Sequence, residues 1–218
     1  MNKKTNKLLI ISSILCLLPA IFCIFIYNKL TDKIPTHFDI DGNIDSYGSK
    51  LFVCIILPLI LFILNIVINL VINNDPNKKN HNKSLKKLIY FLIPIMSLIF
   101  IPTSILISLG ININISIIAP IFISFLFILI GNYLPKCRQN YTMGIRLPWT
   151  LNDEKNWKKT HRLAGLLYVI SGILNIIITI VFNTLSYYTL ITSLILTSII
   201  ITLYSFMIYK KQKKHLIN

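Results

Sequence analysis

The sequence predicts an all-α integral membrane protein, a six-helix transmembrane bundle with both termini in the cytoplasm and a short extracellular hairpin between the first two helices. Composition is the first observation behind this fold class. Hydrophobic residues make up 55% of the 218 residues and charged residues only 13%, with a mean hydropathy of +0.71. Soluble domains carry about 25% charged residues. The other two observations are six long apolar runs and an uneven placement of Lys and Arg between the loops.

Each apolar run is as long as the roughly 20 residues that a helix needs to cross a bilayer. None contains Asp, Glu, Lys, Arg or His in its interior. Because the hydrocarbon core offers the backbone no hydrogen-bond partner, each run is predicted to be helical. The runs are Leu8–Tyr27, Leu51–Ile72, Leu88–Leu109, Ile115–Leu134, Leu163–Asn183 and Tyr188–Tyr209.

Positive charge predicts the orientation of these spans. With the N-terminus inside, 19 of the 22 Lys and Arg residues fall on the inner side, and only Lys29, Lys33 and Lys50 fall outside. Inner loops of membrane proteins are enriched in Lys and Arg. This distribution explains the net charge of +15 without a nucleic-acid partner. The basic C-terminal tail is expected to lie against anionic lipid, at about 1 kcal/mol per residue.

The only sizeable outer loop, residues 28–50, is predicted to form a short β-hairpin. The Asp41-Gly42 pair stands between short apolar-polar alternations, and glycine readily adopts the positive φ of such turns. This loop holds four of the seven acidic residues of the chain, which are Asp32, Asp39, Asp41 and Asp45.

Two interpretations of these acids stay open. In one they stabilise the turn by bonding their own backbone, and in the other they contact a ligand that arrives from outside. The spacing also resembles the first half of a calcium-binding loop, but Ile44 and Lys50 stand where that loop needs Gly and Glu. Zinc is disfavoured because no second His or Cys lies near His37. We therefore expect no metal and no cofactor.

The inner loop, residues 135–162, is rich in aromatic and basic residues. Pro135 is expected to end the fourth span. A helix is predicted to begin near residues 150–152, with Asp153 and Glu154 in its first turn, and to continue into the fifth span.

Two interpretations of the inner loop are also open. Trp149 and Trp157 are typical interface anchors, and the basic run is a typical inside flank. Alternatively, the loop is a docking or gating element, because Arg146 and Arg162 can bind carboxylate or phosphate and His161 can titrate near neutral pH.

Asparagines within the spans are predicted to hydrogen-bond across helix–helix contacts rather than to line a substrate path. Asn65 and Asn69 share one face of the second span, and Asn175, Thr179 and Asn183 share one face of the fifth.

One stretch of the chain combines glycine, aromatic, amide and basic residues in a specific order. These residues are Gly131, Asn132, Tyr133, Asn140, Gly144, Ile145, Arg146, Pro148, Trp149, Thr150, Leu151, Trp157, Thr160, His161, Arg162 and Gly165. With them the stretch resembles the SdpI family of bacterial membrane proteins, and it departs from the family pattern at Leu147, where a small polar residue is usual.

A second stretch, Ile34 to Lys50, resembles a small domain of unknown function that often precedes this family's pattern. The resemblance divides the chain into an N-terminal two-helix unit (1–87) and a four-helix unit (88–218).

The resemblance implies a plasma-membrane protein that protects its cell from a secreted sporulation-delaying-type peptide toxin. Members of the family can also capture a cytoplasmic transcriptional repressor at the inner face, which makes a repressor a further expected partner. A transporter or channel is the alternative, but the spans lack the ionisable residues that transport usually needs. An enzyme is disfavoured because no nucleophile stands beside a base. The expected partner- and toxin-binding residues are His37, Asp39, Asp41, Asp45, Asn132, Tyr133, Asn140, Gly144, Arg146, Pro148, Trp149, Trp157, Thr160, His161 and Arg162.

Overall fold

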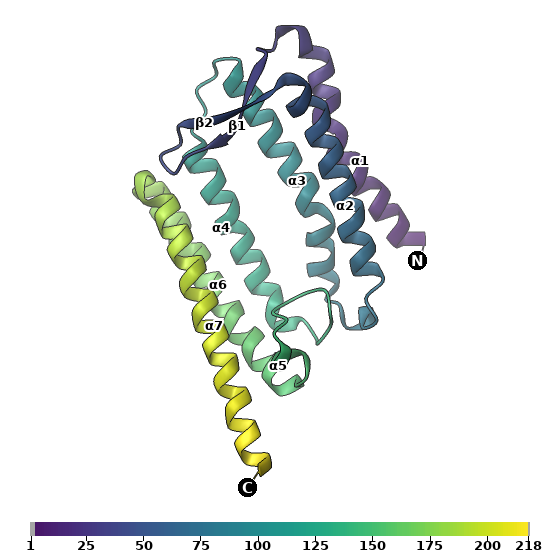
Figure 1. Ribbon diagram of the computed structural model, residues 1–218, viewed down its shortest axis with the longest axis vertical. Coiled ribbons are helices and arrows are strands. Elements are labelled where there is room, and N and C mark those ends of the chain that lie inside the picture. Colours follow the sequence, from purple (N-terminus) through teal and green to yellow (C-terminus); the bar gives the residue numbers. More distant parts are fainter. Residues whose placement is uncertain (1–2, 218) are drawn as a thin grey trace. The chain divides into compact units, whose positions relative to one another are not determined.

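The computed structural model describes the backbone of residues 3–217 and the side chains of residues 6–213. Six of its helices are long and apolar enough to cross a membrane, which confirms the predicted spans. The side chains of Lys3, Lys4 and Lys214, counted above on the inner side, lie outside the described residues. The six helices are α1 (Lys3–Ile26), α2 (Leu57–Asn73), α3 (Lys83–Ser108), α4 (Ile115–Tyr133), α6 (Glu154–Val181) and α7 (Ser186–Ile217), and five residues of π-helix (Phe52–Ile56) lead into α2 (Figure 1).

By its packing the chain forms two compact units. The first, residues 1–74 and 86–115, holds α1, α2, α3 and a β-hairpin. The second, residues 75–85 and 116–218, holds the remaining helices and the loop after α2. These units describe packing, and the domain boundary at residues 87 and 88 stays a prediction from the family resemblance.

Polar side chains join the helices of the first unit. The buried Asn65 amide on α2 donates to the hydroxyls of Ser12 and Ser13 on α1, both at 3.1 Å. Ser97 on α3 donates to the carbonyl of Cys16 at 2.9 Å. The predicted role of Asn65 in helix–helix contact is therefore confirmed.

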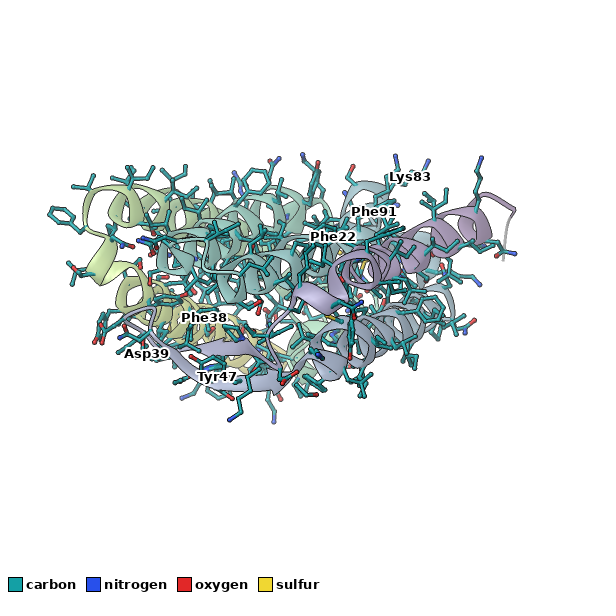
Figure 2. The ribbon with its side chains drawn as sticks, turned by 90° about the horizontal axis from the view of Figure 1, so that it is seen from above. Phe22, Phe38, Asp39, Tyr47, Lys83 and Phe91 are labelled. Carbon is teal, nitrogen blue, oxygen red and sulfur yellow. The ribbon has the colours of Figure 1, made fainter. Side chains whose placement is uncertain are left out.

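The predicted hairpin is present between α1 and α2. Strand β1 (Lys33–Phe38) pairs antiparallel with β2 (Ile44–Ser49), and Gly42 in the turn has a φ of 87°. Figure 2 shows Asp39 near the tip and Tyr47 on the returning strand.

The base of the hairpin is fixed to the helices of its own unit. Ile34 is fully buried in a cluster with Cys23, Val53 and Ile105, and the Ser104 hydroxyl donates to the carbonyl of Pro35. The hairpin therefore has a rigid base and an exposed tip.

Close glycine contacts bring α4 and α6 together in the second unit. A Cβ on Gly165 would lie 2.6 Å from the Pro135 ring and 2.7 Å from the Gly131 carbonyl oxygen. Further along, the Asn175 amide on α6 donates to the Ser193 hydroxyl on α7 at 2.8 Å. This hydrogen bond confirms the predicted role for Asn175 alone. Thr179 donates to the carbonyl of Asn175 on its own helix, and Asn183 lies beyond the end of α6.

The inner loop departs from its prediction at one point. A separate short helix, α5 (Pro148–Leu151), comes first, and α6 begins only at Glu154. The predicted start near residues 150–152 was wrong because Asp153 is the N-cap, with extended backbone and a carboxylate that accepts from the Asn156 N–H at 2.6 Å. The predicted continuation into the fifth span is confirmed, since α6 runs unbroken to Val181.

Candidate functional site

The tip of the outer hairpin is organised by one carboxylate. Asp39 Oδ1 accepts the backbone N–H groups of Asp41 at 2.9 Å and Asn43 at 2.8 Å. The bond from the Asn43 N–H is the main cause that lowers the pKa of Asp39. The expected turn role is therefore confirmed for Asp39, whose charge stabilises the loop it belongs to.

The other acids of the tip remain available to solvent. His37 Nδ1 lies 2.7 Å from Asp45 Oδ1, and their side chains are 70% and 44% exposed. The strand register shifts on either side of His37 and leaves Asp45 out of the pairing. Asp41 is exposed and has no side-chain partner among residues 6–213. A ligand at the tip would thus meet Asp41 and the His37–Asp45 pair first.

No three His, Cys, Asp or Glu residues gather to hold a metal ion within the described part of the chain. His37 and Asp45 supply two such groups, and Asp39 is occupied by the turn.

The inner loop is held together by buried polar side chains, beginning with Asn140. Its Oδ1 accepts the N–H groups of Thr142 at 3.0 Å and Met143 at 2.7 Å. Its Nδ2 donates to the carbonyl of Arg138 at 2.8 Å and to Cys137 Sγ at 3.3 Å. Asn140 is fully buried, so these bonds fix the backbone of the loop.

The loop closes over α6 at His161. The Nε2 of His161 accepts the Ile145 N–H at 2.9 Å, and Nδ1 lies 2.8 Å from the Trp157 carbonyl. One nitrogen must accept while the other donates, so these bonds assign a neutral ring with its proton on Nδ1. Trp157 stacks on this ring, 4.0 Å between centroids, and its Nε1 donates to the Cys137 carbonyl at 2.8 Å. The loop backbone passes close beside the His161 ring at Gly144, whose φ is 104°.

A second set of contacts attaches this loop to α7. Trp149 Nε1 donates to the Ser205 hydroxyl at 2.9 Å, and the Asn156 amide donates to the Ser205 carbonyl at 2.9 Å. Thr160 in turn donates to Asn156 Oδ1 at 2.9 Å. Pro148 supplies the first residue of α5, which carries Trp149 to this position.

Sequence reasoning missed a buried acid in the loop after α2. The Asp75 carboxylate is fully buried, and Oδ2 accepts from Thr142 Oγ1 at 2.6 Å, the Tyr141 N–H at 3.1 Å and His81 Nε2 at 3.1 Å. Asp75 therefore joins residues 75–85 to the inner loop. The available signal was a single acid in a stretch, residues 73–87, that holds five lysines. His81 lies only six residues from Asp75, but Tyr141 and Thr142 lie more than 60 residues away in sequence.

The pKa of Asp75 is lower than usual. Burial alone would raise the pKa, but the hydrogen bonds from Thr142, His81 and the Asn77 N–H outweigh burial. The carboxylate is thus ionised as it holds the two inner loops together.

The expected site residues therefore divide into two groups. Asn140, Trp157, Thr160 and His161 are buried, while Gly144, Pro148 and Trp149 lie partly or fully accessible within the same framework. Asn132, Arg146 and Arg162 are exposed, and Arg146 donates to the Tyr141 carbonyl at 2.7 Å. Tyr133 is half-buried, with the Lys136 ammonium 5.6 Å from its ring centroid. His37 and the hairpin acids belong to the first unit, and the other expected site residues belong to the second.

The chain has six apolar helices, a folded polar hairpin in its first unit and a folded aromatic-basic loop in its second. These features define a multi-pass membrane protein with two polar surfaces. Residues 136–209 match the model of the SdpI/YfhL protein family, and residues 14–62 match that of a domain of unknown function, DUF1648. The chain is 30% identical over 203 residues to the immunity protein SdpI of Bacillus subtilis (strain 168), covering 93% of this chain and 96% of the relative. The chain belongs to the SdpI family.

This membership and the six candidate spans identify a multi-pass protein of the bacterial plasma membrane. No solved structure matches the chain.

Proposed function

We propose that this chain is a membrane immunity protein that protects its cell against a secreted peptide toxin of the sporulation-delaying type. The observation that supports the proposal most is the similarity to an immunity protein along nearly the whole of both chains. The proposed function is not enzymatic and uses no cofactor.

We assign first contact with the toxin to the hairpin tip. Asp41 and the His37–Asp45 pair are exposed there, on a base that is packed against α1, α2 and α3. Exposed carboxylates on a rigid support can bind cationic or hydrogen-bond-donating groups of a peptide without ordering a flexible loop first.

Protection of toxin-sensitive bacteria tests this assignment. Cells that express the wild-type chain are expected to survive the peptide, and the double variant Asp41→Asn, Asp45→Asn is expected to protect at least about tenfold less well. Asp32→Asn is the matched control, because Asp32 pairs with Lys50 at 3.0 Å near the base of the hairpin. Equal protection by both variants would contradict a role for the tip.

We also propose that the exposed part of the inner loop receives a cytoplasmic repressor protein. Arg146 supports this, because it is exposed, and its contact with the Tyr141 carbonyl holds it over a loop that is itself fixed. Guanidinium groups bind carboxylates in a bidentate geometry.

The test separates signalling from protection. Arg146→Gln is expected to abolish toxin-dependent relief of a repressed reporter gene while cells stay protected, with Lys155→Gln as the control for lost charge. Loss of protection together with reporter response would show that Arg146 supports the fold or the toxin site instead.

A further inference from the structure

We propose that a cationic cleft between the ends of α4 and α6 binds the phosphate group of an anionic phospholipid. The cleft has a volume of about 450 Å³, within the roughly 300–1,000 Å³ typical of small-ligand sites. The toxin and repressor assignments above are independent of this proposal. The charged residues that line the cleft are Lys136, Arg138, Glu154, Lys158 and Arg162.

The charge of the cleft is mostly unneutralised. Its one acid, Glu154, already pairs with Lys158 at 2.8 Å. The guanidinium groups of Arg138 and Arg162 have no hydrogen-bond or ion-pair partner among the side chains of residues 6–213. The cleft is lined by four cations and one carboxylate, Glu154, whose charge is shared between Lys158 and Arg138. An anion bound among these cations lowers the electrostatic energy. Phosphate suits this set, because guanidinium binds its oxygens through paired hydrogen bonds.

The wall and base of the cleft are rigid. Trp157 is fully buried and lines the cleft while its Nε1 is bonded to the Cys137 carbonyl. Pro135 packs against the Gly165 position of α6. The two sides of the cleft are therefore fixed before any ligand binds, which reduces the entropy lost on binding.

Position favours a lipid as the source of the phosphate. The cleft is lined by residues 135–139, which directly follow the apolar run of α4, and by residues 154–162, which directly precede the apolar run of α6. Both sides of the cleft therefore lie where the apolar runs end, at the depth of lipid headgroups. A phospholipid could place its phosphate among the cations while its acyl chains follow the exposed apolar side chains of α6, such as Leu166 and Ile170.

Native mass spectrometry of the full chain in detergent tests the proposal. The probes are phosphatidylglycerol and phosphatidylcholine with the same acyl chains. The wild-type chain is expected to retain phosphatidylglycerol in preference to phosphatidylcholine. The double variant Arg138→Gln, Arg162→Gln is expected to bind phosphatidylglycerol about tenfold more weakly.

The matched control is Lys155→Gln, Lys159→Gln, which removes the same charge from exposed positions of α6 that do not line the cleft. This control is expected to bind phosphatidylglycerol as the wild type does. The pair Arg138→Lys, Arg162→Lys is expected to recover part of the binding, and an unchanged helical circular dichroism spectrum in each variant would exclude misfolding. If the arginine double variant and the lysine double variant bind phosphatidylglycerol equally well, the proposal is wrong.

Two further outcomes would assign the cleft to another ligand. If soluble glycerol 3-phosphate displaces phosphatidylglycerol at equal concentration, the ligand is a free phosphate ester, and the lipid assignment is wrong. If Arg138→Gln, Arg162→Gln keeps its lipid but no longer retains a cytoplasmic protein, the cleft binds an acidic protein surface, and the lipid assignment is again wrong. No displacement by glycerol 3-phosphate, together with loss of lipid in the cleft variant alone, supports the lipid.

Discussion

At the scale of single residues, the inner loop depends on Gly144. A Cβ there would lie 2.3 Å from His161 Nε2, and the φ of 104° already disfavours any other residue. Gly144→Ala is expected to lower the free energy of unfolding by about 2–3 kcal/mol, because it combines backbone strain with loss of the bond between Ile145 and His161. Thermal unfolding in detergent, followed by tryptophan fluorescence, measures the effect.

Gly110→Ala is the matched control. Gly110 has a similar φ of 85° but nothing within 4 Å of the added carbon. Only the backbone strain remains, which costs about 1–2 kcal/mol. Equal losses in the two variants would contradict the claim that Gly144 makes room for His161.

The buried Asp75 carboxylate is expected to make the stability of the folded chain depend on pH. Its pKa is lower in the folded chain, so its stabilisation is complete above the unfolded pKa of about 3.9 and is lost as the pH falls through the folded pKa. Asp75→Asn is therefore expected to unfold at a lower temperature at neutral pH and to lose less stability than the wild type below about pH 4.

Asp41→Asn is the control for Asp75, since Asp41 is exposed and has no described partner. Thermal midpoints across pH 3–7, a range that spans the pKa of free carboxyls, should run parallel for this control and the wild type. If the thermal midpoint of Asp75→Asn falls with pH as steeply as that of the wild type, the buried carboxylate is not what links the two inner loops.

At the scale of elements, α4 and α6 approach too closely for a side chain at Gly165. Gly→Ala within a helix usually stabilises it by about 1 kcal/mol. Here the added methyl group meets the Pro135 ring and the Gly131 backbone within 2.7 Å, so Gly165→Ala is expected to destabilise by about 1–3 kcal/mol. Leu166→Ala, at a 58% exposed position on the same helix, should change the thermal midpoint far less.

Most of the helices and strands could be predicted from the sequence, but some of the contacts and boundaries could not. Hydropathy and length predicted all six spans, since the bilayer allows few alternatives to a helix, and Asp41-Gly42 predicted the hairpin because its turn chemistry is local. By contrast, the hydrogen-bonded pair Asp75 and Thr142 lie 67 residues apart in the sequence, and no periodic pattern relates them. The break between α5 and α6 depends on Asp153 serving as a cap, which local composition did not distinguish from a first-turn acid.

The family resemblance selected the candidate residues as a set, but it did not predict where each lies in the fold. The resemblance named Asn140, Trp157 and His161 together, and the structure shows that all three are buried within one framework. Their spacing in the sequence did not show which of them face solvent, because burial depends on how the loop folds over α6. Arg146 and Arg162 therefore carry more of the proposed ligand contacts than the buried aromatic residues do.

At the scale of the whole molecule, the predicted orientation places the hairpin outside and the aromatic-basic loop inside. The four cysteines are at most 3% exposed, so the unmodified chain offers little background for thiol labelling. Asp41→Cys is expected to react with a membrane-impermeant maleimide in intact cells, and Lys159→Cys only after the cells are permeabilised. If Lys159→Cys reacts in intact cells and Asp41→Cys reacts only after permeabilisation, the predicted orientation is wrong.

Protection of the cell membrane from a secreted peptide toxin is the function that we propose for this chain. The most direct measurement follows the membrane potential of toxin-sensitive bacteria as a sporulation-delaying-type peptide is added, with and without the wild-type chain. We predict that the potential is preserved in cells that express the chain and collapses in cells that carry the empty vector. Collapse at the same rate in both would contradict direct immunity to that peptide.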